Sequence, residues 1–257
     1  MTKEVIFVQQ TEILVRSSLD GTMQPSLYRK SPSAEKRPLL VGLHTWSYDR
    51  FNQVSDLLPL AEEHDFNLIL PEFRGANLEH NPIRTQACAS ELAMRDIRDA
   101  VDYAVADGAD PAHVFLYGCS GGGHMALMMA AYCPAYFEAI AAFVPITHLK
   151  KWADYNAYYR PHILACCSED EAEMAKRSPM SYVDEISRAN VKIFHGKYDT
   201  SVPFTQSVEL FNATLEKHPT AKVYLDIFDG GHDRDLDQAM YWFKSQYKNT
   251  TKDAVTG

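Results

Sequence analysis

Short apolar runs alternate with amphipathic segments along most of the chain. The continuous runs Leu39–His44, Phe66–Leu70 and Val114–Cys119 are typical of strands buried on both faces of a parallel sheet. Phe51–His64 and Glu91–Ala106 instead carry apolar residues at helical spacing. This alternation predicts an α/β fold, with a mostly parallel sheet covered by helices on both faces.

The same alternation resumes in the second half of the chain. We expect strands at Phe137–Val144, Val191–Phe194 and Val223–Phe228, and helices at Phe204–Leu215 and Leu236–Tyr247. These segments extend the parallel sheet to the C-terminal part of the sequence.

The N-terminal segment has a different pattern. Val5–Val8, Glu12–Arg16 and Gln24–Tyr28 have strand spacing, and Asp20-Gly21 is a turn signal. We therefore expect an antiparallel lead-in to the sheet.

A second departure follows the strand predicted at Phe137–Val144. Residues 145–188 lack the strand–helix rhythm, and we interpret them as an inserted cap with a helical piece at Glu169–Lys176. Residues 250–257 are expected to form a flexible tail. With no internal repeat and no low-complexity linker, residues 1–257 are predicted to form a single domain.

Composition narrows the classes of partner. The net charge of −9 and the lack of a basic run argue against nucleic acid and against an anionic membrane surface. No apolar run approaches the roughly 20 residues of a membrane span. The sequence is compatible with a homo-oligomer but does not specify one.

The cysteines indicate a reducing compartment. Their number is five, which is odd, and two of them are adjacent, so they do not form a disulfide framework. The first residues show no basic segment followed by an apolar one, as a signal peptide would. We therefore expect a cytoplasmic location.

The segment Gly118-Cys119-Ser120-Gly121-Gly122 matches the pattern G-x-S-x-G of a nucleophile elbow. In such an elbow a serine occupies a strained turn between a strand and a helix, and neighbouring backbones approach closely. Gly118 and Gly122 lack the Cβ atoms that would obstruct this approach. Ser120 is therefore the candidate nucleophile.

A serine hydroxyl needs a base, and the base needs an orienting acid. Asp199 follows the strand predicted at Val191–Phe194, and His232 follows the last predicted strand in a Gly-Gly turn. Catalytic groups gather at such carboxyl ends of open α/β sheets. We assign Asp199 as the acid and His232 as the base. Residues that we set aside, on grounds of position, are Asp226, Asp229, His195 and His218.

A tetrahedral oxyanion needs two backbone donors. One is expected to be the N–H of Gly121, which follows the nucleophile. The other should come from the loop after His44, where we prefer the N–H of Trp46 and keep Thr45 as the alternative.

Several motifs together resemble the α/β-hydrolase superfamily, and in particular the catalytic domain of the prolyl oligopeptidase family and its small esterase relatives. The motifs are Gly118-Cys-Ser-Gly-Gly, Ser178-Pro-Met-Ser-Tyr-Val183, His195-Gly-x-x-Asp199-x-x-Val202-Pro203 and Gly230-Gly-His232. The resemblance implies an α/β-hydrolase fold, a mostly parallel eight-stranded sheet with a small helical cap. It also implies a Ser120–Asp199–His232 triad that uses no metal and no organic cofactor.

Peptidases of that family carry a large N-terminal propeller, for which this chain has no room, whereas small members are often acetyl xylan or feruloyl esterases. We therefore expect a serine carboxylesterase that acts on a small acyl ester, such as an acylated carbohydrate. The alternative is a small serine peptidase or aminopeptidase. A second alternative is a hydrolase-like binding protein without catalysis.

Other residues are candidates for substrate contact. Aromatic faces suit sugars and aryl acids, so the cap aromatics either bind substrate or form the core of the cap. Arg74 is expected to pin its own loop. The substrate-contact candidates are His44, Cys119, Trp152, Tyr155, Tyr158 and Tyr159.

Overall fold

The computed structural model describes residues 10–253, with side chains through residue 247. Its eight strands are β1 (Thr11–Arg16), β2 (Met23–Arg29), β3 (Leu39–Leu43), β4 (Asn67–Pro71), β5 (Val114–Cys119), β6 (Ala139–Phe143), β7 (Val191–Gly196) and β8 (Val223–Phe228). The α-helices are α1 (Val54–Glu63), α2 (Glu91–Ala106), α3 (Gly121–Tyr132), α4 (Leu149–Tyr155), α5 (Arg160–Cys166), α6 (Glu171–Lys176), α7 (Val183–Ile186), α8 (Thr205–Lys217) and α9 (Leu236–Asp253). Two 3-10 helices are η1 (Arg84–Gln86) and η2 (Pro179–Tyr182).

The strands form one eight-stranded sheet in the order β1-β2-β4-β3-β5-β6-β7-β8. β1 and β2 pair antiparallel with each other, and β2 pairs antiparallel with β4. The remaining pairs are parallel. The predicted class, the parallel sheet and the antiparallel lead-in are therefore confirmed, while the strand predicted at Val5–Val8 lies outside the described residues.

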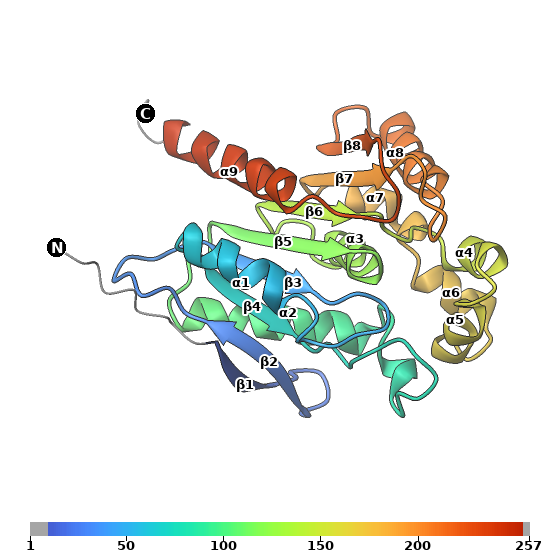
Figure 1. Ribbon diagram of the computed structural model, residues 1–257, viewed down its shortest axis with the longest axis horizontal. Coiled ribbons are helices and arrows are strands. Elements are labelled where there is room, and N and C mark those ends of the chain that lie inside the picture. Colours follow the sequence, from blue (N-terminus) through green and yellow to red (C-terminus); the bar gives the residue numbers. More distant parts are fainter. Residues whose placement is uncertain (1–9, 254–257) are drawn as a thin grey trace.

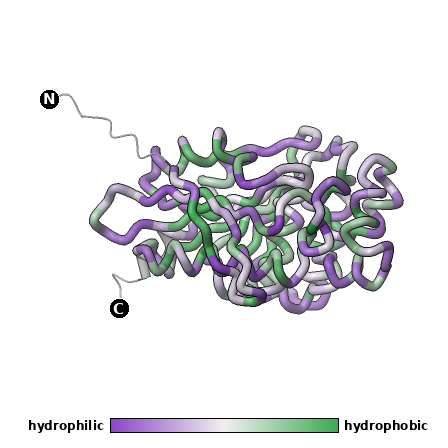
Figure 2. The backbone as a smooth tube through the Cα atoms, turned by 90° about the horizontal axis from the view of Figure 1, so that it is seen from below, coloured by the Kyte–Doolittle hydropathy of each residue, from purple (hydrophilic) through white to green (hydrophobic). Residues whose placement is uncertain are grey.

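Two hydrophobic clusters lie on the two faces of the sheet. Leu39, Val41 and Leu43 of β3 pack in the cluster that includes α2, α3 and α8, and Leu40 packs in the cluster with α1 and α9. Because successive side chains of a strand point to opposite faces, an entirely apolar strand serves both clusters. Figure 1 shows α1 and α9 on one side of the sheet and α2 and α3 on the other. Figure 2 shows hydrophobic segments concentrated in the middle of the molecule, with hydrophilic segments in the outlying loops.

The outer part of the cap consists of α4, α5 and α6, which form a group beyond the carboxyl ends of the strands (Figure 1). These helices share a small core with Trp46 and Val202, which belong to the loops after β3 and β7. Ile186, by contrast, packs into the cluster beneath α3, so the end of the predicted insertion joins the main core. The cap core thus touches two loops at the carboxyl edge of the sheet.

Some element boundaries differ from the prediction. α1 begins at Val54 instead of Phe51, which is half exposed in the turn before the helix. α9 continues to Asp253, so residues 250–253 are helical and not a tail. Residues 254–257 lie outside the described part of the chain.

Candidate active site

Ser120 occupies the turn between β5 and α3, with φ 56° and ψ −118°, a conformation that non-glycine residues rarely adopt. A Cβ on Gly118 would lie 2.0 Å from the carbonyl oxygen of Gly122, and a Cβ on Gly122 would lie 2.5 Å from that of Leu43. The turn therefore requires both glycines. The Ser120 N–H donates to the Phe143 carbonyl at 2.9 Å, which ties the elbow to β6.

The three side chains that the sequence singled out are in hydrogen-bond contact. His232 Nε2 lies 2.9 Å from Ser120 Oγ, and His232 Nδ1 lies 2.7 Å from Asp199 Oδ2. The Asp199 carboxylate is fully buried, whereas 28% of the His232 side chain is exposed. A ring that donates from Nδ1 to the carboxylate keeps Nε2 free to accept the hydroxyl proton of Ser120.

The Asp199 carboxylate accepts hydrogen bonds at both of its oxygens. Oδ1 accepts from the N–H groups of Ser201 at 2.8 Å and Val202 at 2.9 Å. Oδ2 lies near His232 and 3.2 Å from His195 Nε2. Burial acts to raise the pKa of Asp199, but the hydrogen bonds from His195, His232 and the Val202 N–H outweigh it and hold the pKa well below its usual range. Asp199 therefore stays ionised at neutral pH.

His195, which we set aside on grounds of its position, is a partner of Asp199. Its ring is fully buried, with Nδ1 2.7 Å from Ser207 Oγ and Nε2 2.9 Å from the Val202 carbonyl. Because a carbonyl only accepts, Nε2 carries the proton, and the Ser207 hydroxyl donates to Nδ1. The four-residue spacing from His195 to Asp199 was the one sequence signal for this contact.

Two backbone N–H groups adjoin the nucleophile. A Cβ on Gly121 would lie only 2.4 Å from the Trp46 nitrogen, so the two backbones are in close contact. In the described part of the chain neither N–H has a protein acceptor. The Thr45 N–H instead donates to Asn52 Oδ1 at 3.0 Å, so the alternative oxyanion donor at Thr45 is wrong. Gly121 and Trp46 are left as the pair of free donors beside Ser120.

His44 and Cys119 do not lie in position to contact substrate, which corrects that prediction. The buried His44 ring stacks on Phe73 with centroids 3.8 Å apart, and its nitrogens lie 2.9 Å from the carbonyls of Thr45 and Glu72. Burial lowers the pKa of His44, and the ring braces its loop. Cys119 packs in the cluster with α1 and α9, where burial raises its thiol pKa to about 12.

The cap aromatics divide into buried and exposed members. Trp152 is 1% exposed, and Tyr159 stacks on it with centroids 4.8 Å apart. The prediction that Trp152 binds substrate is therefore wrong, because its ring is enclosed in the cap core. Tyr155 and Tyr158 are 52% and 73% exposed, and their substrate role stays a prediction. Arg74 pairs with Asp96 and Asp20, as expected of a residue that pins its loop.

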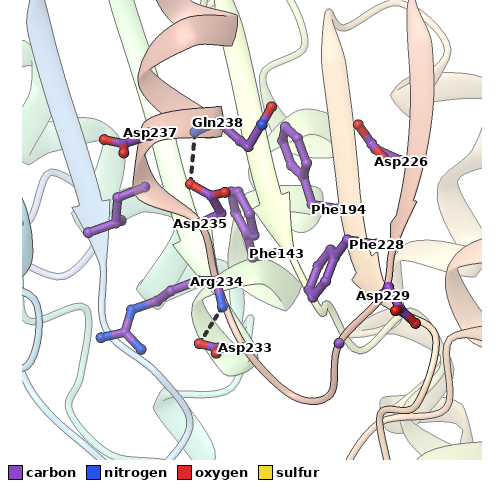
Figure 3. Close-up of a pocket in the computed structure, with 12 residues that line it drawn as sticks. Phe143, Phe194, Asp226, Phe228, Asp229, Asp233, Arg234, Asp235, Asp237 and Gln238 are labelled. Atoms are coloured by element: carbon purple, nitrogen blue, oxygen red, sulfur yellow. Dashed lines mark hydrogen bonds between the residues drawn. The ribbon is translucent and has the colours of Figure 1, made fainter.

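A cavity of about 700 Å³ lies beside the loop that carries His232. Figure 3 shows Phe143, Phe194 and Phe228 on one side of it and the start of α9 on the other. Ser120 is not among its lining residues, so the cavity is not formed around the nucleophile.

Within residues 10–253 no group of three or more His, Cys, Asp or Glu could hold a metal ion. No helix among these residues is long and apolar enough to cross a membrane.

The strand order, the elbow after β5, the acid after β7 and the histidine after β8 define an α/β-hydrolase fold. Comparison with known proteins agrees. Residues 60–252 match the prolyl oligopeptidase family, and the chain belongs to that family.

Known relatives are much longer than this chain. The acylamino-acid-releasing enzyme of Arabidopsis thaliana is 26% identical over 62% of the chain and 22% of its own length. The human acylamino-acid-releasing enzyme is 22% identical over 76% of the chain and 28% of its length. The chain thus spans about a quarter of these relatives.

Solved structures share the fold. An acylaminoacyl peptidase in complex with Z-Gly-Gly-Phe-chloromethyl ketone aligns with a TM-score of 0.71 and 18% identity, over 93% of this chain and 40% of its own. A puromycin-hydrolysing peptidase of Mycobacterium tuberculosis aligns with a TM-score of 0.75 and 19% identity, over 92% of this chain and 38% of its own. These alignments confirm the α/β-hydrolase fold.

Proposed function

We propose that this chain is the hydrolase domain of a serine peptidase that cleaves the amide bond after an acylated amino acid. The observation that carries the proposal is the continuous hydrogen-bonded chain from Ser120 through His232 to Asp199, at 2.9 and 2.7 Å. A binding protein without catalysis would not need this arrangement, because the strained Ser120 backbone is costly to maintain without a chemical role.

The mechanism follows from the positions of the atoms. Ser120 Oγ attacks the substrate carbonyl while His232 Nε2 removes its proton, and the ionised Asp199 stabilises the imidazolium. The N–H groups of Trp46 and Gly121 donate to the developing oxyanion. His232 then protonates the leaving amine, and water attacks the acyl-enzyme by the same route.

The peptidase alternative is better supported than the expected carboxylesterase. The esterase expectation rested on chain length, whereas the relatives that match in sequence are named acylamino-acid-releasing enzymes. A serine hydrolase that cleaves amides also cleaves activated esters, since both reactions pass through the same acyl-enzyme. Ester turnover alone therefore does not distinguish the two functions.

The test compares N-acetyl-alanine p-nitroanilide, alanine p-nitroanilide and p-nitrophenyl acetate on the full chain. We expect the acetylated anilide to exceed the free anilide in kcat/KM by at least tenfold. Ser120→Ala should abolish turnover and fluorophosphonate labelling, while Ser55→Ala, an exposed serine of α1, should preserve both. Turnover of the acetate ester without any anilide cleavage would support the carboxylesterase instead.

A further inference from the structure

Helix α4 and its C-cap residue Asn156 direct three side-chain donors at two consecutive carbonyls of the acid loop, residues 197–204 between β7 and α8. Trp152 Nε1 donates to the Ser201 carbonyl at 2.9 Å, and Asn156 Nδ2 donates to the same oxygen at 3.1 Å. The Tyr155 hydroxyl donates to the Thr200 carbonyl at 3.2 Å. The cap is thus bonded to this loop.

Ser201 is also a direct partner of the acid. Its N–H donates to Asp199 Oδ1 at 2.8 Å, while its carbonyl accepts from the Trp152 indole at 2.9 Å. A displacement of Ser201 would therefore rotate the Asp199 carboxylate relative to His232, whose Nδ1 lies 2.7 Å from Oδ2. Ser201 thus links the indole N–H of Trp152 to the triad through two hydrogen bonds.

The same indole contacts the oxyanion side of the site. The rings of Trp152 and Trp46 meet edge to face with centroids 4.9 Å apart, and they are 1% and 2% exposed. The Trp46 carbonyl accepts from the Asn77 N–H at 2.8 Å, so this residue is held on both sides. The Trp46 N–H, which lies against Gly121 and has no protein acceptor among the described residues, is one of the two proposed oxyanion donors.

We infer that Trp152 is a positioning residue that holds the acid loop and the Trp46 backbone in a fixed relation to each other. The inference rests on the proposed function, because the groups that Trp152 would hold in place are those of the proposed catalytic site. A buried indole N–H usually takes an acceptor, and the acceptor here is the carbonyl of the residue whose own N–H bonds Asp199. Trp242, for comparison, meets the Tyr224 ring edge to face, and its buried N–H has no partner among the described residues.

The experiment compares Trp152→Phe with the matched control Trp242→Phe, with p-nitrophenyl acetate as substrate. Phenylalanine keeps a ring in the cap core but removes the indole donor to the Ser201 carbonyl, which retains only the Asn156 Nδ2 donor at 3.1 Å. We expect kcat to fall about tenfold, the equivalent of one neutral hydrogen bond, with KM unchanged. Trp242→Phe should match the wild type in both constants.

The pH–rate profile separates positioning from a loss of folded protein. A loosened Asp199 stabilises the protonated His232 ring less well, so the acid limb of kcat/KM should move to lower pH in Trp152→Phe. Partial unfolding would lower the plateau of kcat/KM without moving the acid limb of the profile along the pH axis. If Trp152→Phe does not fold, Tyr155→Phe and Asn156→Ala decide the question, each with an expected two- to threefold fall in kcat and the same direction of shift.

Two outcomes would overturn this inference while leaving the proposed function in place. An unchanged kcat with a raised KM would make Trp152 a substrate contact, and a lowered plateau without a shift would make it a packing residue only. A wild-type chain that neither turns over substrate nor reacts with a fluorophosphonate would instead overturn the proposed function, and the inference with it.

Discussion

Gly121→Ala tests the oxyanion geometry most directly. The added Cβ would lie 2.4 Å from the Trp46 nitrogen and 2.6 Å from its Cα, both of which are backbone atoms. Carbon contacts need about 3.5 Å, so the two backbones would have to separate by about 1 Å. An oxyanion donor acts at about 2.7–3.1 Å, and the same displacement would take it beyond hydrogen-bond range.

Loss of one such donor costs on the order of 10²–10³ in kcat, or about 3–4 kcal/mol. We therefore expect Gly121→Ala to lose at least 100-fold in kcat for p-nitrophenyl acetate, with little change in KM. The matched control is Gly231→Ala, whose Cβ would meet nothing within 4 Å; it should stay within about threefold of wild type. A folded Gly121→Ala that keeps more than a tenth of the wild-type kcat would refute the assignment of Gly121 and Trp46.

Three further predictions follow from the site and its surroundings. Asp199→Asn should fold, with kcat about 10⁴-fold lower by analogy with a serine protease; full activity would move the acid role elsewhere. Cys119→Ala should keep kcat within about threefold, because the thiol faces the cluster with α1 and α9; a larger loss would restore Cys119 as a substrate contact. Burial lowers the pKa of His124 from 6.5 to about 4, so the unfolded chain takes up its proton first and stability should fall as pH drops from 6.5 to 4. Thermal unfolding of His124→Gln should depend less steeply on pH over that range, and an identical dependence would contradict this assignment.

The positions of Ser120, Asp199 and His232 could be predicted because each lies within four residues of the end of a strand. Strands buried on both faces leave continuous apolar runs, and parallel strands bring their carboxyl ends to one edge. The order of the strands in the chain then places these three residues near one another. The pattern of apolar runs and the residues just after them were therefore sufficient to predict the triad.

The roles of Trp152, Thr45 and His195 could not be predicted in this way. Trp152 binds a carbonyl 49 residues further along the chain, and aromatic character alone does not distinguish a buried brace from a sugar-stacking surface. Thr45, the alternative to Trp46, is not an oxyanion donor because its N–H donates to the side chain of Asn52. Such contacts depend on loop conformation, for which the hydrophobic pattern contains no information.

The base of the triad depends on the last strand of the sheet. Among the described strands β8 pairs with β7 alone, and its Tyr224 and Ile227 are 45% and 43% exposed. β5, which leads into Ser120, is instead buried along its whole length. Edge elements with few buried contacts open at lower free energy than central ones. On gentle heating, the enzyme should therefore lose activity by local detachment of β8 before its circular dichroism changes, and early cooling should restore that activity.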